Sequence, residues 1–236
     1  MAQAFNKFAK KYIGDIMEKE GFVPYKTTYF IRLTENNRLV QFISFSSGAS
    51  GGCRYLEVGY LPLFMKHASN TISSEIHGRM KDRPPCGWGS FCWKFPKGDM
   101  KTAEESMIEI KNVIIKYTIP YLNRYCTFES ILEMLEEDKP DVVPEVYNAL
   151  SRGKSHHKGY FAMGAGDYKK AEKYFKESYS RFKPENRIKE ISRWIMEELE
   201  EILDAIHDND KIEQVMEKNR QHTIELMKLR KYITIN

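Results

Sequence analysis

The spacing of apolar residues changes period twice along the chain, and this change restricts the folds that the chain can adopt. Between residues 5 and 17, apolar side chains recur every three or four positions, as in an amphipathic helix. They then alternate with polar residues in three strand-length runs, TTYFIRL, RLVQFISFS and RYLEVGYLP. After Thr127 the helical period returns, so the sequence predicts an α+β fold with an all-helical carboxyl-terminal region.

A fourth strand is predicted within RPPCGWGSFCWKFP, residues 83–96, where Phe91, Trp93 and Phe95 alternate with smaller or polar residues. We interpret this stretch as an entry loop and a strand, with Trp93 packed and Trp88 at a rim. The connection TENN is short enough to make the first two strands an antiparallel hairpin. The front part is therefore predicted to be a four-stranded antiparallel sheet covered by helices, with residues 62–85 forming a loop with a helical turn or two.

Capping residues predict where the helices begin and end. Gly21 is placed as a left-handed cap of the first helix, and a long helix is expected to begin near Asp99 or Thr102, with an irregularity at Pro120. No strand signal follows Thr127. The predicted domains are residues 1–126, a helix, four strands and a long helix, and residues 127–236, which are helical. Four later helices are expected at Ser155–Ala165, Tyr168–Phe182, Glu185–His207 and Asp210–Arg230.

The segment GYFAMGAGDYKKAEKYFKESY resembles a single tetratricopeptide repeat over residues 152–184. Its five matching positions are Gly159, Gly166, Tyr168, Ala171 and Phe175, whereas Lys158 and Ala162 depart from the repeat and no second copy is present. The resemblance implies an antiparallel helical hairpin and, in arrays of such repeats, a peptide-binding groove. Residues proposed for partner binding on this basis are Tyr160, Tyr168, Lys169 and Tyr174.

The front half resembles a bacterial family catalogued as domain of unknown function 4304, over residues 3–135. The likeness rests on the order of its elements and on FNKFAKKYIGDIMEKEGF, TYFI and VQFISF. The resemblance implies a compact α+β fold with an antiparallel sheet. It implies no chemistry and no catalytic residues.

Charge and composition favour a cytoplasmic protein. The amino terminus lacks the apolar run of a signal peptide, no stretch is long and apolar enough to span a membrane, and the four cysteines are scattered as reduced thiols would be. Lys and Arg outnumber Asp and Glu by 14 to 8 in residues 1–100. This mild excess, with Trp88, Trp93, Tyr55 and Phe42 as stacking candidates, is a weak basis for nucleic-acid binding.

The sequence shows no catalytic motif, no metal-ligand spacing and no cofactor-binding loop. It therefore favours a non-enzymatic cytosolic factor that binds a protein partner, with a regulatory or toxin-neutralising role as one form of this hypothesis. An alternative is a ligand-binding protein or enzyme with a pocket between the sheet and loop 62–85, formed by Trp88, His67, His77 and Arg83. The apolar stripe of the last helix is a candidate for a homodimer contact; its residues are Ile212, Val215, Met216, Ile224 and Met227.

Overall fold

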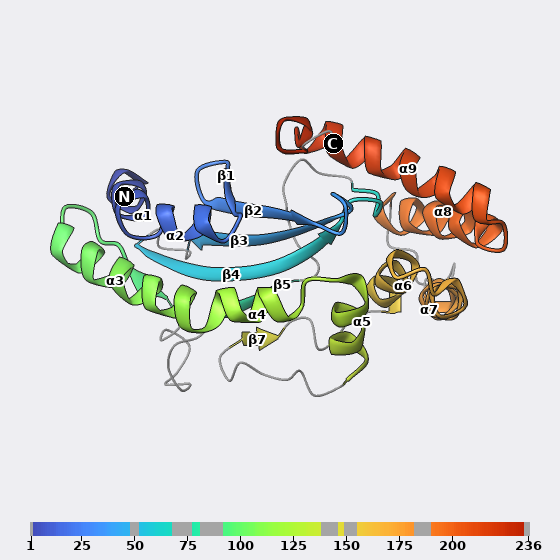
Figure 1. Cartoon of the computed structure of the whole chain (residues 1–236), viewed down its shortest axis with the longest axis horizontal. Coiled ribbons are helices and arrows are strands. Elements are labelled where there is room, and N and C mark those ends of the chain that lie inside the picture. The colour runs from blue at the N-terminus through green and yellow to red at the C-terminus, as the bar shows by residue number, and fades with distance from the viewer. Residues whose placement is uncertain are drawn as a thin grey trace.

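The computed structural model is an α+β protein (Figure 1) and describes residues 2–47, 52–67, 77–80, 92–137, 146–148, 155–181 and 190–233. An antiparallel sheet with its covering helices forms one end of the molecule, and a group of helices forms the other end. The predicted fold class, an antiparallel sheet followed by a helical region, is confirmed. Among the described residues, none of the helices has both the length and the apolar character that a bilayer span requires.

The sheet has strand order β1-β2-β3-β4-β5-β7, with β6 paired to β4, and all of its pairings are antiparallel. The longest pairing in the sheet is between β3 and β4, and it runs from Leu39 opposite Pro62 to Ser47 opposite Arg54. The four predicted strands correspond to β2, β3, β4 and β6. The strands are β1 Val23–Tyr25, β2 Tyr29–Thr34, β3 Leu39–Ser47, β4 Cys53–Pro62, β5 His77–Met80, β6 Trp93–Lys94 and β7 Val146–Asn148.

Within the described residues the sheet has seven strands, not the four predicted, because three short strands were not expected. β1 precedes the first predicted strand and pairs with it. β5 lies in the stretch that was expected to be a loop with helical turns, and β7 lies beyond Thr127, where no strand was expected. β5 pairs with β4, and β7 pairs with β5. Strands of three or four residues are too short to show alternation, and pairing at a sheet edge requires only backbone hydrogen bonds.

Helices α1 to α4 cover one face of the sheet, as the apolar stripe of the first helix predicted. Phe5 of α1 packs against Phe45 of β3, with ring centroids 5.0 Å apart. On the same face, the buried Gln41 amide donates to the carbonyl groups of Leu122 and Tyr125 at 2.7 and 2.9 Å. The covering helices are α1 Ala2–Tyr12, α2 Gly14–Lys19, α3 Met100–Val113 and α4 Ile119–Arg124.

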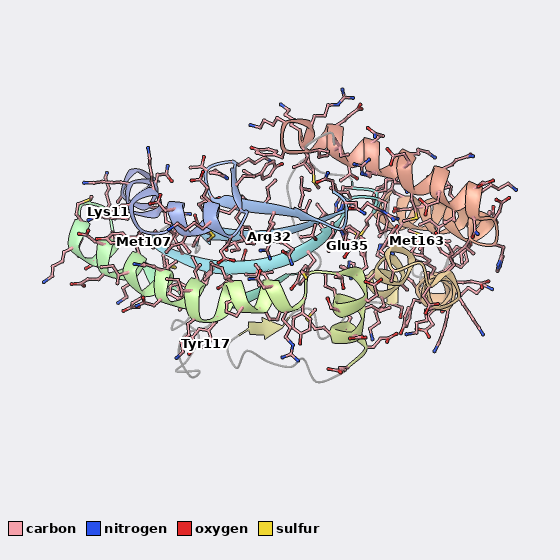
Figure 2. All side chains as sticks on the ribbon, in the orientation of Figure 1. Lys11, Arg32, Glu35, Met107, Tyr117 and Met163 are labelled. Atoms are coloured by element: carbon pink, nitrogen blue, oxygen red, sulfur yellow. The ribbon has the colours of Figure 1, made fainter. Side chains whose placement is uncertain are left out.

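Gly21 ends the first helical segment, as its position in the sequence predicted. Gly21 has φ +76° and completes a Schellman motif, since its own N–H bonds to the Glu18 carbonyl group and the Phe22 N–H to the Met17 carbonyl group. Helices α1 and α3 are joined by an ion pair of 2.7 Å between Lys11 and Glu104. Figure 2 labels Lys11 on α1 and Met107 on α3 at this end of the molecule.

The long helix is interrupted before Pro120, as the sequence predicted. Asp99 caps α3 by accepting a hydrogen bond of 3.0 Å from the Thr102 N–H. A π-helix, Ile114–Thr118, then separates α3 from α4. Pro120 has no N–H to donate to the preceding turn and its ring crowds that turn, so the backbone widens there.

The carboxyl-terminal helices begin with a capping box formed by Thr127 and Ser130. Helices α6 and α7 form an antiparallel hairpin that turns at Gly166, whose φ is +77°. Gly159 allows this pair to pack closely, because a Cβ there would lie 2.5 Å from the Phe175 ring. The bounds are α5 Phe128–Glu136, α6 Ser155–Gly164, α7 Tyr168–Arg181, α8 Glu190–Ala205, α9 Asn209–Leu226 and a final 3₁₀ turn Arg230–Tyr232.

The hydrophobic core continues across the predicted boundary between residues 126 and 127. Phe64, which follows β4, packs against Phe128 of α5 and Tyr160 of α6, with centroid separations of 5.4 and 6.4 Å. The apolar stripe of α9, which was a candidate for a dimer contact, is used within the chain: Ile212, Met216, Ile224 and Met227 are buried in this core. These four side chains are therefore not available for a dimer contact.

Candidate functional site

The predicted ligand pocket beside loop 62–85 is only partly within the described residues. Trp88 and Arg83 lie outside them, and His77 is described only as the first backbone position of β5. His67 is described and is buried just after β4. The four residues cannot be assembled into one site from the described part of the chain.

The predicted partner-binding residues differ in their exposure to solvent. Tyr160 is wholly buried, which corrects its assignment to a partner surface. Tyr168 and Tyr174 are half-buried, and their hydroxyl groups donate to Glu213 and Glu136 at 3.0 and 2.6 Å. Of the four residues, only Lys169 is fully exposed.

The aromatic residues proposed to stack on nucleic-acid bases are mostly internal. Phe42 and Trp93 are buried, Tyr55 is half-buried, and Trp88 lies outside the described residues. Aromatic residues at every second position are expected both on an exposed stacking surface and on a sheet face that helices cover. Here the alternation comes from the covered face, since Phe42 and Trp93 are buried. The burial of Trp93 was predicted correctly, but neither Trp93 nor Phe42 can present a stacking surface.

A cleft of about 230 Å³ lies where the β2–β3 turn meets α9, and we call it the α9 cleft. Its turn belongs to the end of the sheet that faces the carboxyl-terminal helices, where Glu35 is labelled in Figure 2. Its walls combine two arginines, two glutamates and an apolar floor. The lining residues are Asn36, Arg38, Phe64, Glu213, Met216, Glu217 and Arg220.

The turn at the mouth of the cleft has an unusual backbone. Glu35, Asn36 and Asn37 all lie in the left-handed region, with φ of 52°, 52° and 62°. Asparagine tolerates this region, whereas glutamate adopts it at a cost of roughly 1–2 kcal/mol. The Arg38 N–H closes the turn on the Thr34 and Glu35 carbonyl groups at 3.2 and 3.0 Å. Strained backbone of this kind persists where neighbouring structure holds it.

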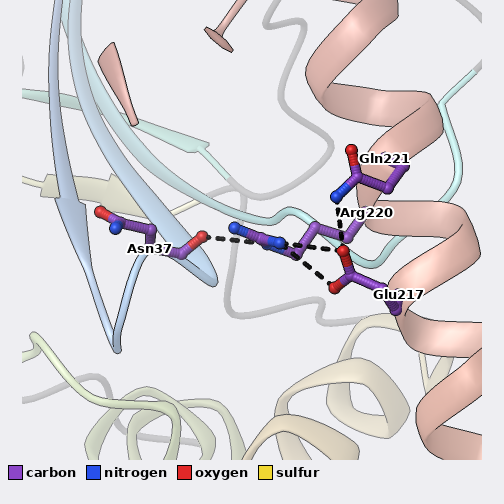
Figure 3. Close-up of polar contacts among 4 residues, drawn as sticks. All are labelled: Asn37, Glu217, Arg220 and Gln221. Atoms are coloured by element: carbon purple, nitrogen blue, oxygen red, sulfur yellow. Dashed lines mark hydrogen bonds and ion pairs between the residues drawn. The ribbon is translucent and has the colours of Figure 1, made fainter. Parts of the chain in front are cut away.

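Arg220 of α9 provides part of that support (Figure 3). Its Nη1 donates to both carboxylate oxygens of Glu217, at 3.1 and 3.2 Å, and its Nε donates to the Asn37 carbonyl group at 3.4 Å. Gln221 donates to the same Glu217 carboxylate. The Nε and Nη1 donors of Arg220 are therefore already used, and they connect α9 to the β2–β3 turn.

Arg38 differs from Arg220 because its guanidinium contacts are weak. Within the described residues, Nη2 lies 4.0 Å from the Glu213 carboxylate and 3.8 Å from the Met216 sulfur, a poor acceptor. The guanidinium carbon lies 5.4 Å from the centre of the Phe64 ring, over which it stacks. A guanidinium has five N–H donors, so most of the hydrogen-bonding capacity of Arg38 remains available to a ligand in the cleft.

A buried carboxyl group lies behind the cleft floor. The Phe64 ring packs on Tyr160, whose hydroxyl donates to Glu198 Oε1 at 2.5 Å, and the Lys66 N–H donates to the same oxygen at 2.9 Å. Glu198 Oε2 is buried and has no hydrogen-bond partner among the described residues. Burial raises the pKa of Glu198 to about 7, against the lowering effect of the hydrogen bonds from Tyr160 and Lys66.

Two further buried polar residues were not expected from the sequence. His156 and His157 form the start of α6, where the neighbouring Lys154 and Lys158 in the sequence favour a solvated helix end, yet both histidines are buried. The His156 ring lies 5.1 Å from the Tyr160 ring, edge to face. Within the described residues, no group of three or more His, Cys, Asp or Glu side chains is arranged to hold a metal ion.

Neither a scan against protein-family models nor searches of curated proteins and solved structures found a match to this chain. The resemblances to domain of unknown function 4304 and to a tetratricopeptide repeat therefore remain predictions.

Proposed function

We propose that this chain is a non-enzymatic protein-binding factor whose α9 cleft receives a single carboxylate side chain from a partner protein. The observation that carries the proposal is the Arg38 guanidinium. It lines the cleft, stacks on Phe64 and is weakly satisfied by its own chain. Planar guanidinium groups bind carboxylates through two parallel hydrogen bonds.

The size and floor of the cleft favour a protein side chain. A volume of about 230 Å³ is below the roughly 300–1,000 Å³ of usual small-molecule pockets. Phe64 and Met216 supply apolar surface for the methylene groups of Asp or Glu, and Arg38 supplies the donors. Charge-assisted hydrogen bonds contribute about 1.5–3 kcal/mol, which corresponds to roughly 10–100-fold in affinity.

The acidic wall of the cleft sets a limit on the ligand. Glu213 and Glu217 come from α9 and face the same cleft as the arginines. They repel a ligand that carries several negative charges close together, such as a nucleic-acid backbone. A single carboxylate, flanked by neutral or basic residues, fits the charges better. This selectivity weighs against the nucleic-acid alternative at this site.

Two synthetic peptide pools test the proposal. Both contain capped heptapeptides with six varied non-acidic positions; one pool has a central Glu and the other a central Gln. The immobilised full-length chain should retain the Glu pool at least about tenfold better than the Gln pool. Arg38→Gln should abolish this preference, whereas Arg230→Gln, an exposed arginine paired with Glu225 outside the cleft, should keep it.

Equal retention of the two pools would contradict the proposal. Displacement of the Glu pool by free glutamate or inorganic phosphate, at concentrations equal to the peptide, would instead favour the small-ligand alternative. Thermal unfolding of both variants controls for loss of folding.

A further inference from the structure

Two cysteines lie diagonally opposite each other where β6 joins β4. The register pairs Cys53 with Lys94 and Arg54 with Trp93. Cys92 immediately precedes β6 and is two residues from Lys94, so it shares the sheet face of Lys94 and Cys53. The Phe95 N–H holds this junction together by donating to the Gly52 carbonyl group at 2.8 Å.

The two thiols are in contact. The Cys92 thiol shares a hydrogen bond with Cys53, and both side chains are partly exposed. Burial, followed by this hydrogen bond, raises the pKa of Cys92 to about 11. Of the cysteines in the described part of the chain, none is in a disulfide. Cys53 and Cys92 are therefore two free, partly exposed cysteines on one face of the sheet.

We propose that Cys53 and Cys92 are a reversible redox pair that forms a disulfide by exchange with a small-molecule disulfide such as oxidised glutathione. Cys53 loses its proton and attacks one glutathione sulfur, forming a mixed disulfide and releasing one glutathione thiolate, which takes up a proton. Cys92 then loses its proton and attacks the Cys53 sulfur, and the second glutathione leaves. Two protein thiols are oxidised, and one glutathione disulfide is reduced to two thiols.

Geometry predicts that this disulfide is easily reduced. Diagonal positions on neighbouring strands lie roughly 7–8 Å apart, whereas the Cα atoms of a disulfide usually lie about 4.4–6.8 Å apart. Bond formation therefore requires β6 to shift toward β4. β6 has two paired residues, so few hydrogen bonds resist this shift. Strained and exposed disulfides have the more oxidising potentials of labile or regulatory bonds.

Oxidation would tie residue 53 to residue 92 and close the chain between them into a loop. That loop includes β5 and residues 62–85, which the sequence suggested as one wall of a pocket. The inference does not depend on the α9 cleft, whose lining residues include neither cysteine.

The experiment uses the native full-length chain in a glutathione buffer with excess oxidised form, at pH 7 and pH 9. Thiols are then blocked by alkylation, and the protein is digested without reduction for mass spectrometry. The expected product is a peptide pair linked through Cys53 and Cys92, reversed by reduced glutathione. The rate of the second step, in which Cys92 displaces glutathione from Cys53, should rise by about tenfold per pH unit, because the thiolate fraction of Cys92 rises by that factor below its pKa.

Cysteine variants make the test specific. Cys53→Ser and Cys92→Ser should abolish the linkage, whereas Cys126→Ser and Cys86→Ser should retain it. A linkage through Cys86 or Cys126 in the native chain would overturn the proposal. Mixed glutathione disulfides that never resolve at pH 9 would also overturn it.

Discussion

Tyr160 of α6 donates a hydrogen bond to the buried carboxyl group of Glu198 on α8, with 2.5 Å between the two oxygens. The Lys66 N–H donates to the same carboxyl oxygen, so this group joins both helices to the end of β4. Its other oxygen is buried without a partner among the described residues. An ionised carboxylate in that setting is costly, so the neutral form is favoured in the folded protein.

Stability should therefore decrease as pH rises through the range in which Glu198 ionises. The folded pKa of about 7 lies above the ordinary value of 4.5, so between these values the folded state holds a proton that the unfolded state has lost. The Glu198 contribution to stability is complete below about pH 4.5 and is lost by about pH 7, a change of roughly 3 kcal/mol.

Urea unfolding of the native chain and of Glu198→Gln from pH 4.5 to pH 8 measures this contribution. The variant should lack this component of the pH slope and be the more stable protein at pH 8. The exposed neighbour Glu197 provides the matched control, since Glu197→Gln should leave the slope unchanged. Parallel pH profiles for the native chain and Glu198→Gln would show that Glu198 is ionised normally.

Removing the Tyr160 hydroxyl should destabilise the same junction. Tyr160→Phe keeps the ring contact with Phe175, at 5.1 Å between centroids, but removes one of two donors to Glu198. The expected loss is about 1–3 kcal/mol, and the pKa of Glu198 should rise further. Tyr179→Phe is the control, because the Tyr179 hydroxyl donates to Glu200 at an exposed position. Equal stability of the two variants in urea would contradict this account.

The close packing of α6 on α7 makes Gly159 sensitive to substitution. A Cβ at this position would lie 2.5 Å from the Phe175 ring, so Gly159→Ala should lower the free energy of unfolding by about 1–3 kcal/mol. Adding Phe175→Leu should recover part of the loss. Gly14→Ala is the control, because a Cβ there meets nothing within 4 Å. A neutral Gly159→Ala in thermal unfolding would mean that the hairpin packs less closely.

Features that depend on neighbouring residues in sequence were predicted well. The Gly21 cap and the Asp99 cap each use contacts within a few residues. The period of apolar residues likewise gave the main strands and the helices, because burial of one face imposes that period.

Features that depend on distant contacts were missed. In the α9 cleft, Arg38 at the β2–β3 turn lies close to Glu213 and Met216 of α9, which are far from it in sequence. The signal within the sequence was limited to Asn36 and Asn37, which mark a turn but not what it contacts. His156 and His157 are buried because α6 packs on other elements, and no local pattern encodes that packing. β1, β5 and β7 are too short for a period to be visible.

The most direct test of the proposed function is the affinity of full-length chain for the tightest-binding acidic heptapeptide, measured by calorimetry for the native protein and Arg38→Gln. The account predicts at least about tenfold weaker binding by Arg38→Gln, and a change below about twofold for Arg230→Gln. It also predicts that replacing the central Glu of the peptide with Gln weakens binding to the native chain but not to Arg38→Gln. Equal affinity of native protein and Arg38→Gln for the acidic peptide would contradict the claim that Arg38 receives a partner's carboxylate.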